Sequence, residues 1–95
     1  MAVVGVLTLE LHIEGAHSLK DKRHLVKGLK DRLRSRHNVA VAETDFHDAW
    51  QRSRLMAVTV SSERVRAEQV LQAVEGDAAR IAGGALVGAW TEWIE

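Results

Sequence analysis

Hydrophobic residues recur with a period of two over the first thirteen positions of the chain. One face of such an extended segment carries Val3, Leu7, Leu9, Leu11 and Ile13. The opposite face is apolar at its start, with Val4 and Val6, and polar at its end, with Glu10 and His12. A period of two is typical of a β-strand. The pattern therefore predicts a strand over residues 2–13 with one face in the core and the other only partly in solvent.

The next segment has the signals of an α-helix. Ser18 is a preferred N-cap residue, and Asp21 stands three positions on, where a capping box has its acidic residue. Apolar residues then recur at helical spacing, at Leu19, Leu25, Val26, Leu29 and Leu33. We predict a helix from residue 19 to about residue 36, with Asn38 as its stop.

A second helical pattern follows residue 62. Its apolar positions are Val70, Leu71, Val74, Ala78 and Ile81. We expect Ser61 or Ser62 to cap its start, Glu63 to lie in its first turn, and the glycines at 83–84 to end it. Gly76 lies inside the pattern and predicts a bend or an early end there.

Two β-like segments, 39–46 and 55–61, lie between the helices. The residues that join them include no Gly or Pro, so we predict a long hairpin instead of a tight turn. Its arms are expected to reach about residue 48 and to resume near residue 51. Register within 45–54 is left open by the pattern.

The last strand is predicted over residues 86–94, where the period of two sends Trp90 and Trp93 to opposite faces. The resulting order is β-α-β-β-α-β over residues 1–95. This order predicts a single α+β domain of ferredoxin-like type, with a four-stranded antiparallel sheet and two helices on one face. The other face of the sheet is then uncovered. Val4, Val6 and one of Trp90 and Trp93 would form an apolar patch there, which favours a homodimer or a partner contact.

Composition is that of an ordinary globular protein, with 46% hydrophobic and 27% charged residues. The chain has no Cys, which excludes a disulfide scaffold, a thiolate metal site and a thiol nucleophile. The first thirteen residues lack the basic start of a secretory signal, and no apolar stretch is long enough to span a bilayer. We therefore expect a cytoplasmic protein with no membrane role.

The formal net charge of zero conceals a strong segregation of charge. Residues 20–37 hold eight Lys and Arg against two Asp, a net charge of +6, and the rest of the chain balances it with −6. Arg23, Lys27, Lys30 and Arg34 fall on one side of the predicted helix. Such a stripe can follow the phosphates of RNA. The alternatives are a solvated helix that keeps the protein soluble, or an acidic protein partner.

The start of the first helix is a second candidate for anion binding. His17, Lys20 and Arg23 surround backbone N–H groups at the positive end of the helix dipole. The alternative, which we favour, is that Ser18 caps the helix and His17 bonds within the loop. Ser18 and an anion would compete for the same amides.

Two acidic and histidine clusters could suggest other chemistry. Glu43, Asp45, His47, Asp48 and Arg52 surround Trp50, and such residues can ligate a metal. A hairpin rim with salt bridges, with Trp50 packed under the loop, explains them better.

Glu10 and His12 share the open sheet face as a potential acid–base pair, but nothing supplies a nucleophile or an oxyanion site. We expect no catalytic residue, metal or cofactor. The single Phe and the absence of Tyr do not fit the sheet aromatics of an RNA-recognition motif, and the Gly-x-x-Gly clamp of a KH domain is missing.

Three blocks of sequence, together with the opening segment, carry a family resemblance. The run of residues 15–23, Gly-Ala-His-Ser-Leu-Lys-Asp-Lys-Arg, closely resembles the hallmark of the YlxP-like proteins, a small bacterial family of unknown function. Residues 38–43 and 48–52 match as well, as do residues 4–12. The resemblance implies a ferredoxin-like fold and no particular activity. Members of that family are often encoded among genes of translation and ribosome maturation, an association without a mechanism.

Together these observations predict a non-catalytic accessory protein that contacts ribosomal or other structured RNA through its first helix. Arg23, Lys27, Lys30 and Arg34 would supply the phosphate contacts, with Lys20 and His17 at the helix start. The alternative is a protein-interaction or homodimerisation module that uses the open sheet face and has no role with nucleic acid.

Overall fold

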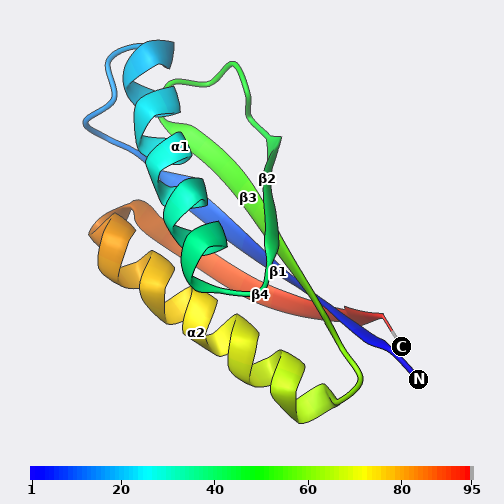
Figure 1. The fold of residues 1–95 in the computed structure, drawn as a ribbon. Coiled ribbons are helices and arrows are strands. Elements are labelled where there is room, and N and C mark those ends of the chain that lie inside the picture. The colour runs from blue at the N-terminus through cyan, green and yellow to red at the C-terminus, as the bar shows by residue number, and fades with distance from the viewer. Residues whose placement is uncertain (95) are drawn as a thin grey trace.

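A four-stranded sheet lies against two helices in the computed structural model, which describes residues 1–94 (Figure 1). The elements in chain order are β1 (Val3–His12), α1 (Leu19–Arg36), β2 (Ala40–Asp45), β3 (Arg52–Ser61), α2 (Arg64–Ala82), the 3₁₀ turn η1 (Gly83–Ala85) and β4 (Leu86–Ile94). The strand order is β2-β3-β1-β4, and every neighbouring pair is antiparallel. Both helices cover the same face (Figure 1). The predicted ferredoxin-like architecture is confirmed.

The core lies between this face of the sheet and the helices. Leu7 and Leu9 of β1 and Leu55 of β3 are fully buried, and they pack with Leu33 of α1 and Val74 of α2. The alternation in β1 thus sends the expected residues inward. Removing these aliphatic side chains from water is the main favourable term in the stability of the domain.

The start of α2 differs from the prediction. The N-cap is Glu63, whose side chain makes no capping hydrogen bond, and the first helical residue is Arg64. The hydroxyl of Ser61 accepts a hydrogen bond from the Glu63 amide at 3.1 Å, so this serine orders the turn before the helix instead of capping it. Ser62 is not the cap either. Gly76 does not end the helix, which continues to Ala82 because packing of its apolar face outweighs one weak helix former.

The hairpin between β2 and β3 is shorter on its first arm than predicted. β2 ends at Asp45, and Phe46 has a positive φ of 64°. A left-handed residue cannot continue a strand, so the chain leaves the sheet there instead of near residue 48. β3 begins at Arg52, one residue after the predicted start. The register of β2 on β3 shifts between Glu43 and Asp45.

The register of β4 on β1 settles the positions of the two tryptophans in this strand. Trp93 lies opposite Gly5 and Trp90 opposite Thr8, so they face opposite sides of the sheet, as predicted. Trp93 packs against the core beneath α2. It therefore does not belong to the open face, so of the two alternatives that the sequence left open, only Trp90 can contribute to an interface there. Trp90 is on the open face with 43% of its surface exposed.

Neither helix could cross a membrane. Within residues 1–94, both α1 and α2 carry too many charged side chains for a helix in contact with lipid.

Candidate functional site

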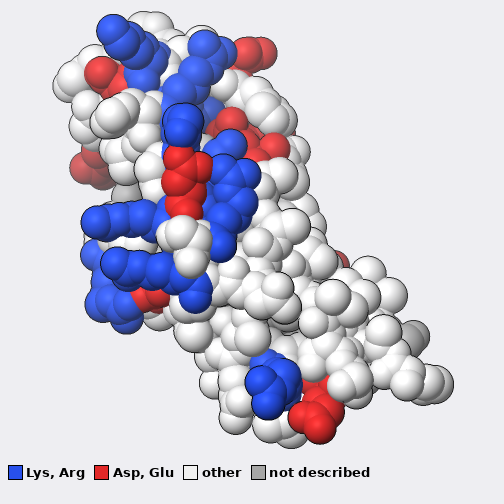
Figure 2. Space-filling model, viewed as in Figure 1, with Lys and Arg blue, Asp and Glu red and all other residues white. Residues whose placement is uncertain are grey.

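The exposed side of α1 carries most of the positive charge of the molecule. Its core side holds Val26, Leu29 and Leu33. Among the four predicted phosphate contacts, Arg23, Lys27 and Arg34 are exposed and Lys30 is half-buried. Figure 2 shows Lys and Arg side chains gathered over this helix, while the part of the same view toward the two chain ends has few charges. The structure therefore gathers the predicted stripe on one accessible side.

An acidic residue divides this stripe. The carboxylate of Asp31 accepts a hydrogen bond from Lys27 at 2.7 Å and another from Arg34 at 2.5 Å. These two bonds hold the pKa of Asp31 below its ordinary value, first through Lys27 and then through Arg34. All three side chains are in contact with solvent, so the pairs are weak and screened by salt. Arg23 and Lys30 form no ion pair with any residue of 1–94 and are the freer cations of the stripe.

The start of α1 is capped as predicted. The Ser18 hydroxyl accepts a hydrogen bond from the Asp21 amide at 3.1 Å, and the His17 amide donates one to the Asp21 carboxylate at 3.2 Å. His17 and Lys20 are exposed beside this box. An anion pocket at this helix end stays a prediction, and any anion would have to compete with the Ser18 hydroxyl for the Asp21 amide and with the Asp21 carboxylate for the His17 amide.

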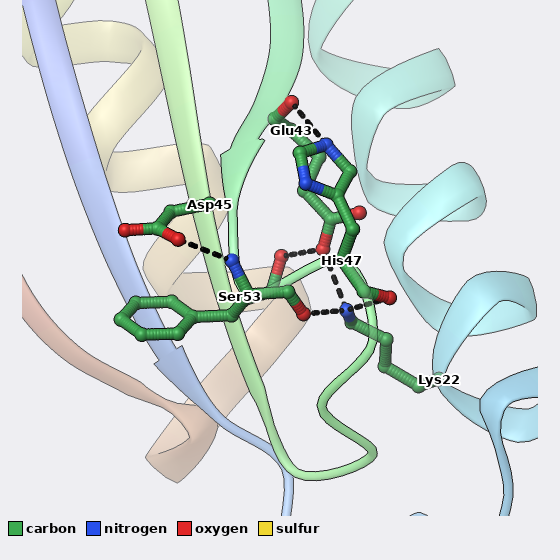
Figure 3. Close-up of polar contacts among 6 residues, drawn as sticks. Lys22, Glu43, Asp45, His47 and Ser53 are labelled. Atoms are coloured by element: carbon green, nitrogen blue, oxygen red, sulfur yellow. Dashed lines mark hydrogen bonds and ion pairs between the residues drawn. The ribbon is translucent and has the colours of Figure 1, made fainter.

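Lys22 is buried. Its position in the basic segment 20–37 is instead typical of an exposed residue. Its ammonium group pairs with the Glu43 carboxylate at 2.8 Å and donates hydrogen bonds to the carbonyl oxygens of Phe46, at 2.7 Å, and His47, at 3.3 Å (Figure 3). Glu43 also accepts a hydrogen bond from the Ser53 hydroxyl at 2.6 Å. The lysine thus joins α1 to β2 and to the loop that follows it. It is not available to a partner.

The three sequence blocks that carry the family resemblance meet at this end of the molecule. Lys22, from the first block, reaches Glu43 of the second. Gln51, from the third, donates hydrogen bonds from its side chain to the carbonyl oxygens of Glu14 and Ala16, and its own carbonyl accepts one from the Ile13 amide at 2.8 Å. The blocks are therefore held together by polar contacts, which fix the β1–α1 connection against the β2–β3 loop.

The hairpin rim has salt bridges, as predicted, but their cations are Arg54 and Lys22 in place of Arg52, and the predicted packing of Trp50 is not seen. Arg54 pairs with Glu10 at 2.6 Å and with Asp45 at 3.5 Å. Trp50 is 53% exposed, so the expectation that it packs under the loop is wrong. The loop is ordered by Lys22 and Gln51 instead, and this leaves the indole outside.

The predicted metal and acid–base alternatives find no assembled site in the described chain. His47 bonds to the Glu43 carbonyl at 3.2 Å, and the Glu10 carboxylate is engaged by Arg54. Among residues 1–94, no group of three His, Asp or Glu side chains is placed to hold a metal ion.

The open face of the sheet has two distinct halves. The half near the chain ends is apolar, because cross-strand pairing places Val4 beside Val60 and Ile94, and Val6 beside Val58. Val60 is 56% exposed, and Val58 and Ile94 are exposed too. Val4 and Val6 are half-buried. We call these five residues the apolar half.

The other half of the open face carries a cluster of arginine and aromatic side chains that the sequence analysis missed. The Arg52 guanidinium lies 3.9 Å from the centre of the Phe46 ring. Arg54 lies between two rings, 5.5 Å from Phe46 and 5.9 Å from Trp90. The sequence gives one indication of this cluster: Arg52 and Arg54 are two positions apart in a strand, so their side chains lie on the same face. Phe46 could not be placed, because its position depends on the left-handed turn.

The fold and its arrangement of helices define the chain as a ferredoxin-like α/β sandwich. A model of the family described as "Protein of unknown function (DUF503)" matches residues 4–87. The chain belongs to this family. It is similar to the "Uncharacterized protein YlxP" of Bacillus subtilis (strain 168), with 38% identity over 72 residues, which are 76% of this chain and 78% of that protein. The resemblance to the YlxP-like proteins is confirmed.

Solved structures agree with this fold. The de novo designed protein Foldit4 superposes with a TM-score of 0.61 at 10% identity, covering 100% of this chain and 98% of the design. A dimeric ferredoxin-like protein of unknown function from Thermobifida fusca has a TM-score of 0.50 at 13% identity, covering 96% of this chain and 90% of that one. At such identities the likeness concerns the fold alone.

Proposed function

We propose that this protein binds structured RNA through the exposed cations of α1 and carries out no catalytic step. The observation that carries the proposal is the stripe of Arg23, Lys27, Lys30 and Arg34 on one accessible side of a single helix, interrupted by one carboxylate. A row of cations on a helix can contact successive phosphates and release their counterions. The central strands β1 and β3 carry no aromatic row, so the contact made by α1 rests on shape and backbone charge.

The test is a titration against ribosomal subunits and a structured RNA at two salt concentrations. If the four cations each neutralise one phosphate, the affinity of the wild type falls about 100-fold between 50 and 200 mM salt, at a slope of ~0.9 per contact. Replacing all four by Ala is expected to abolish most of this binding and to flatten the salt dependence. Arg66→Ala, which removes an exposed cation from α2, is the matched control and leaves binding nearly unchanged.

Asp31→Asn makes the same test sharper. The substitution removes the carboxylate that engages Lys27 and Arg34, so both cations become free for phosphate and RNA binds more tightly. A stripe that served only solubility would show no gain. Absence of binding at low salt, or an unchanged affinity in the fourfold Ala variant, would rule the proposal out.

A second candidate function is self-association through the apolar half of the open face. A second copy of the chain fits this surface because a two-fold dimer brings the same residues together, and an apolar patch is complementary to itself. The exposed Val58, Val60 and Ile94 support this candidate.

Light scattering at high protein concentration is expected to give the mass of a dimer for the wild type under this second candidate. Val60→Lys places a charge within the proposed contact, at its most exposed valine, and should return the protein to a monomer. Val65→Lys is the control, since Val65 is similarly exposed but belongs to α2. A wild type that stays monomeric at every concentration removes the candidate.

A further inference from the structure

Three surface hollows follow one another from the basic side of α1 to the open face of the sheet. The first is lined by Lys20, Arg23, Lys27 and their neighbours, and it meets the second at Leu25. The second crosses the end of the molecule past Gly15 and Gly84. It shares His12 and Val87 with the third, which opens on the sheet face beside Trp90. The three hollows therefore adjoin one another over the end of the β1–β4 pair.

The third hollow has the groups that a nucleotide needs. Trp90 and Arg52 line it, and it encloses about 500 Å³. Trp90 has 43% of its surface exposed, which leaves part of its indole open to contact with a base. Arg52 makes no ion pair with any residue of 1–94, and its guanidinium is held over the Phe46 ring at 3.9 Å. The site thus offers an aromatic surface for a base and an ordered cation for its phosphate.

Neighbouring charges favour an anionic ligand at this place. Glu10 also lines the hollow, but its carboxylate is engaged by Arg54 at 2.6 Å. His12 lies opposite Arg52 in the register of β1 and β3 and is exposed in the lining of this hollow. With Glu10 neutralised, Arg52 is the charge that a ligand would meet in the third hollow.

We propose that the protein binds RNA at an unpaired nucleotide, whose base stacks on Trp90 and whose phosphate contacts Arg52, while the adjoining strand runs over His12 to the cations of α1. This inference rests on the proposed function and specifies the form of RNA that the site takes. The two shorter dimensions of the molecule are 21 and 20 Å. At ~3.4 Å per nucleotide, about six nucleotides span this thickness.

The experiment compares an unstructured RNA of about ten nucleotides, within the site size of small single-strand modules, with a duplex of the same length. Trp90→Ala is expected to weaken binding of the single strand roughly 5- to 100-fold, the loss typical of one stacked base, and to leave the duplex affinity within about twofold. Trp50→Ala is the matched control, because this exposed indole lines none of the three hollows. Arg52→Gln is expected to weaken the single strand and to reduce its salt slope by ~0.7.

The outcomes separate this inference from the proposed function. If the fourfold α1 variant loses binding while Trp90→Ala and Arg52→Gln bind like the wild type, the α1 site stands and the nucleotide site is wrong. Equal losses in Trp90→Ala and Trp50→Ala also overturn it. If no RNA binds at all, both proposals fail. Unfolding curves of each variant show whether it is folded. If Trp90→Ala does not fold, the test uses Arg52→Gln, because Arg52 lies outside the core.

Discussion

Lys22→Met is expected to lower the free energy of unfolding by about 3–5 kcal/mol, the usual cost of removing one partner of a buried ion pair. The thioether side chain fills similar space but donates no hydrogen bond. It leaves the Glu43 carboxylate without its cation and the carbonyl oxygens of Phe46 and His47 without their donor. Because a small domain has only about 5–15 kcal/mol of stability, urea unfolding should show a large shift of the midpoint.

Two comparisons isolate this effect. Lys20→Met changes an exposed lysine two positions away and is expected to alter stability by less than about 0.5 kcal/mol. Adding Glu43→Gln to Lys22→Met removes the unpaired charge, so the double variant should lose less than the sum of the two single losses. If Lys22→Met unfolds at the wild-type urea concentration, the buried lysine does not hold α1 to the hairpin.

The same ion pair predicts a dependence of stability on pH. Burial raises the pKa of Glu43, but hydrogen bonds from Lys22 and Ser53 outweigh it, and the pKa lies below the ordinary value of 4.5. A group whose pKa is lower in the folded state stabilises the fold above its unfolded pKa, and this contribution disappears as the pH falls through the folded value. Unfolding of the wild type should therefore become easier below about pH 5, and less steeply so in Glu43→Gln.

The contacts of Lys22 connect the sequence blocks that carry the family resemblance. Lys22 lies in the first block, Glu43 in the second, and Gln51 in the third. Their polar contacts bring the β1–α1 loop against the β2–β3 loop. Lys22, Glu43 and Gln51 thus have a structural role. Lys20 and Arg23 of the first block are exposed and have no such role, and they are among the residues that the RNA proposal uses.

The order of elements could be predicted because each element carries a local period. β1 alternates, the stripe of α1 repeats at helical spacing, and Gly83 ends α2 with a positive φ. The bounds of β4, and the opposite faces of its two tryptophans, followed from the same reasoning.

What could not be predicted depends on contacts between distant residues. A lysine in a basic helix has the pattern of a surface residue, and Lys22 is buried only because Glu43 supplies its counter-ion from β2. The left-handed backbone of Phe46 could not be predicted, because glycine is the residue that usually indicates a positive φ and this position has none. The arginine–aromatic cluster combines this turn with β3 and β4, so its geometry required the register of the whole sheet.

Gly5→Ala is expected to destabilise the protein by about 1–3 kcal/mol, the usual cost of overfilling a packed core. A methyl group at this position would lie 2.7 Å from the Leu71 Cδ1 and 2.7 Å from the Trp93 Cζ3. Leu71 can rotate away, but the indole is a rigid ring held under the Arg64 guanidinium at 4.0 Å. The clash therefore has to be relieved by moving β1, β4 or α2 apart.

Gly28→Ala is the matched control because it adds the same methyl group where, apart from the chain neighbours and the nearby backbone of the same helix, no atom lies within 4 Å of it. Gly28 lies inside α1, where Ala is favoured by as much as ~1 kcal/mol, so this variant should be more stable than the wild type. The two substitutions thus have opposite expected signs in the same urea experiment. Combining Gly5→Ala with Leu71→Ala should cost less than the sum of the two single losses, since each makes room for the other. If Gly5→Ala proved as stable as Gly28→Ala, the close approach of β1 to Trp93 would not be a constraint on the core.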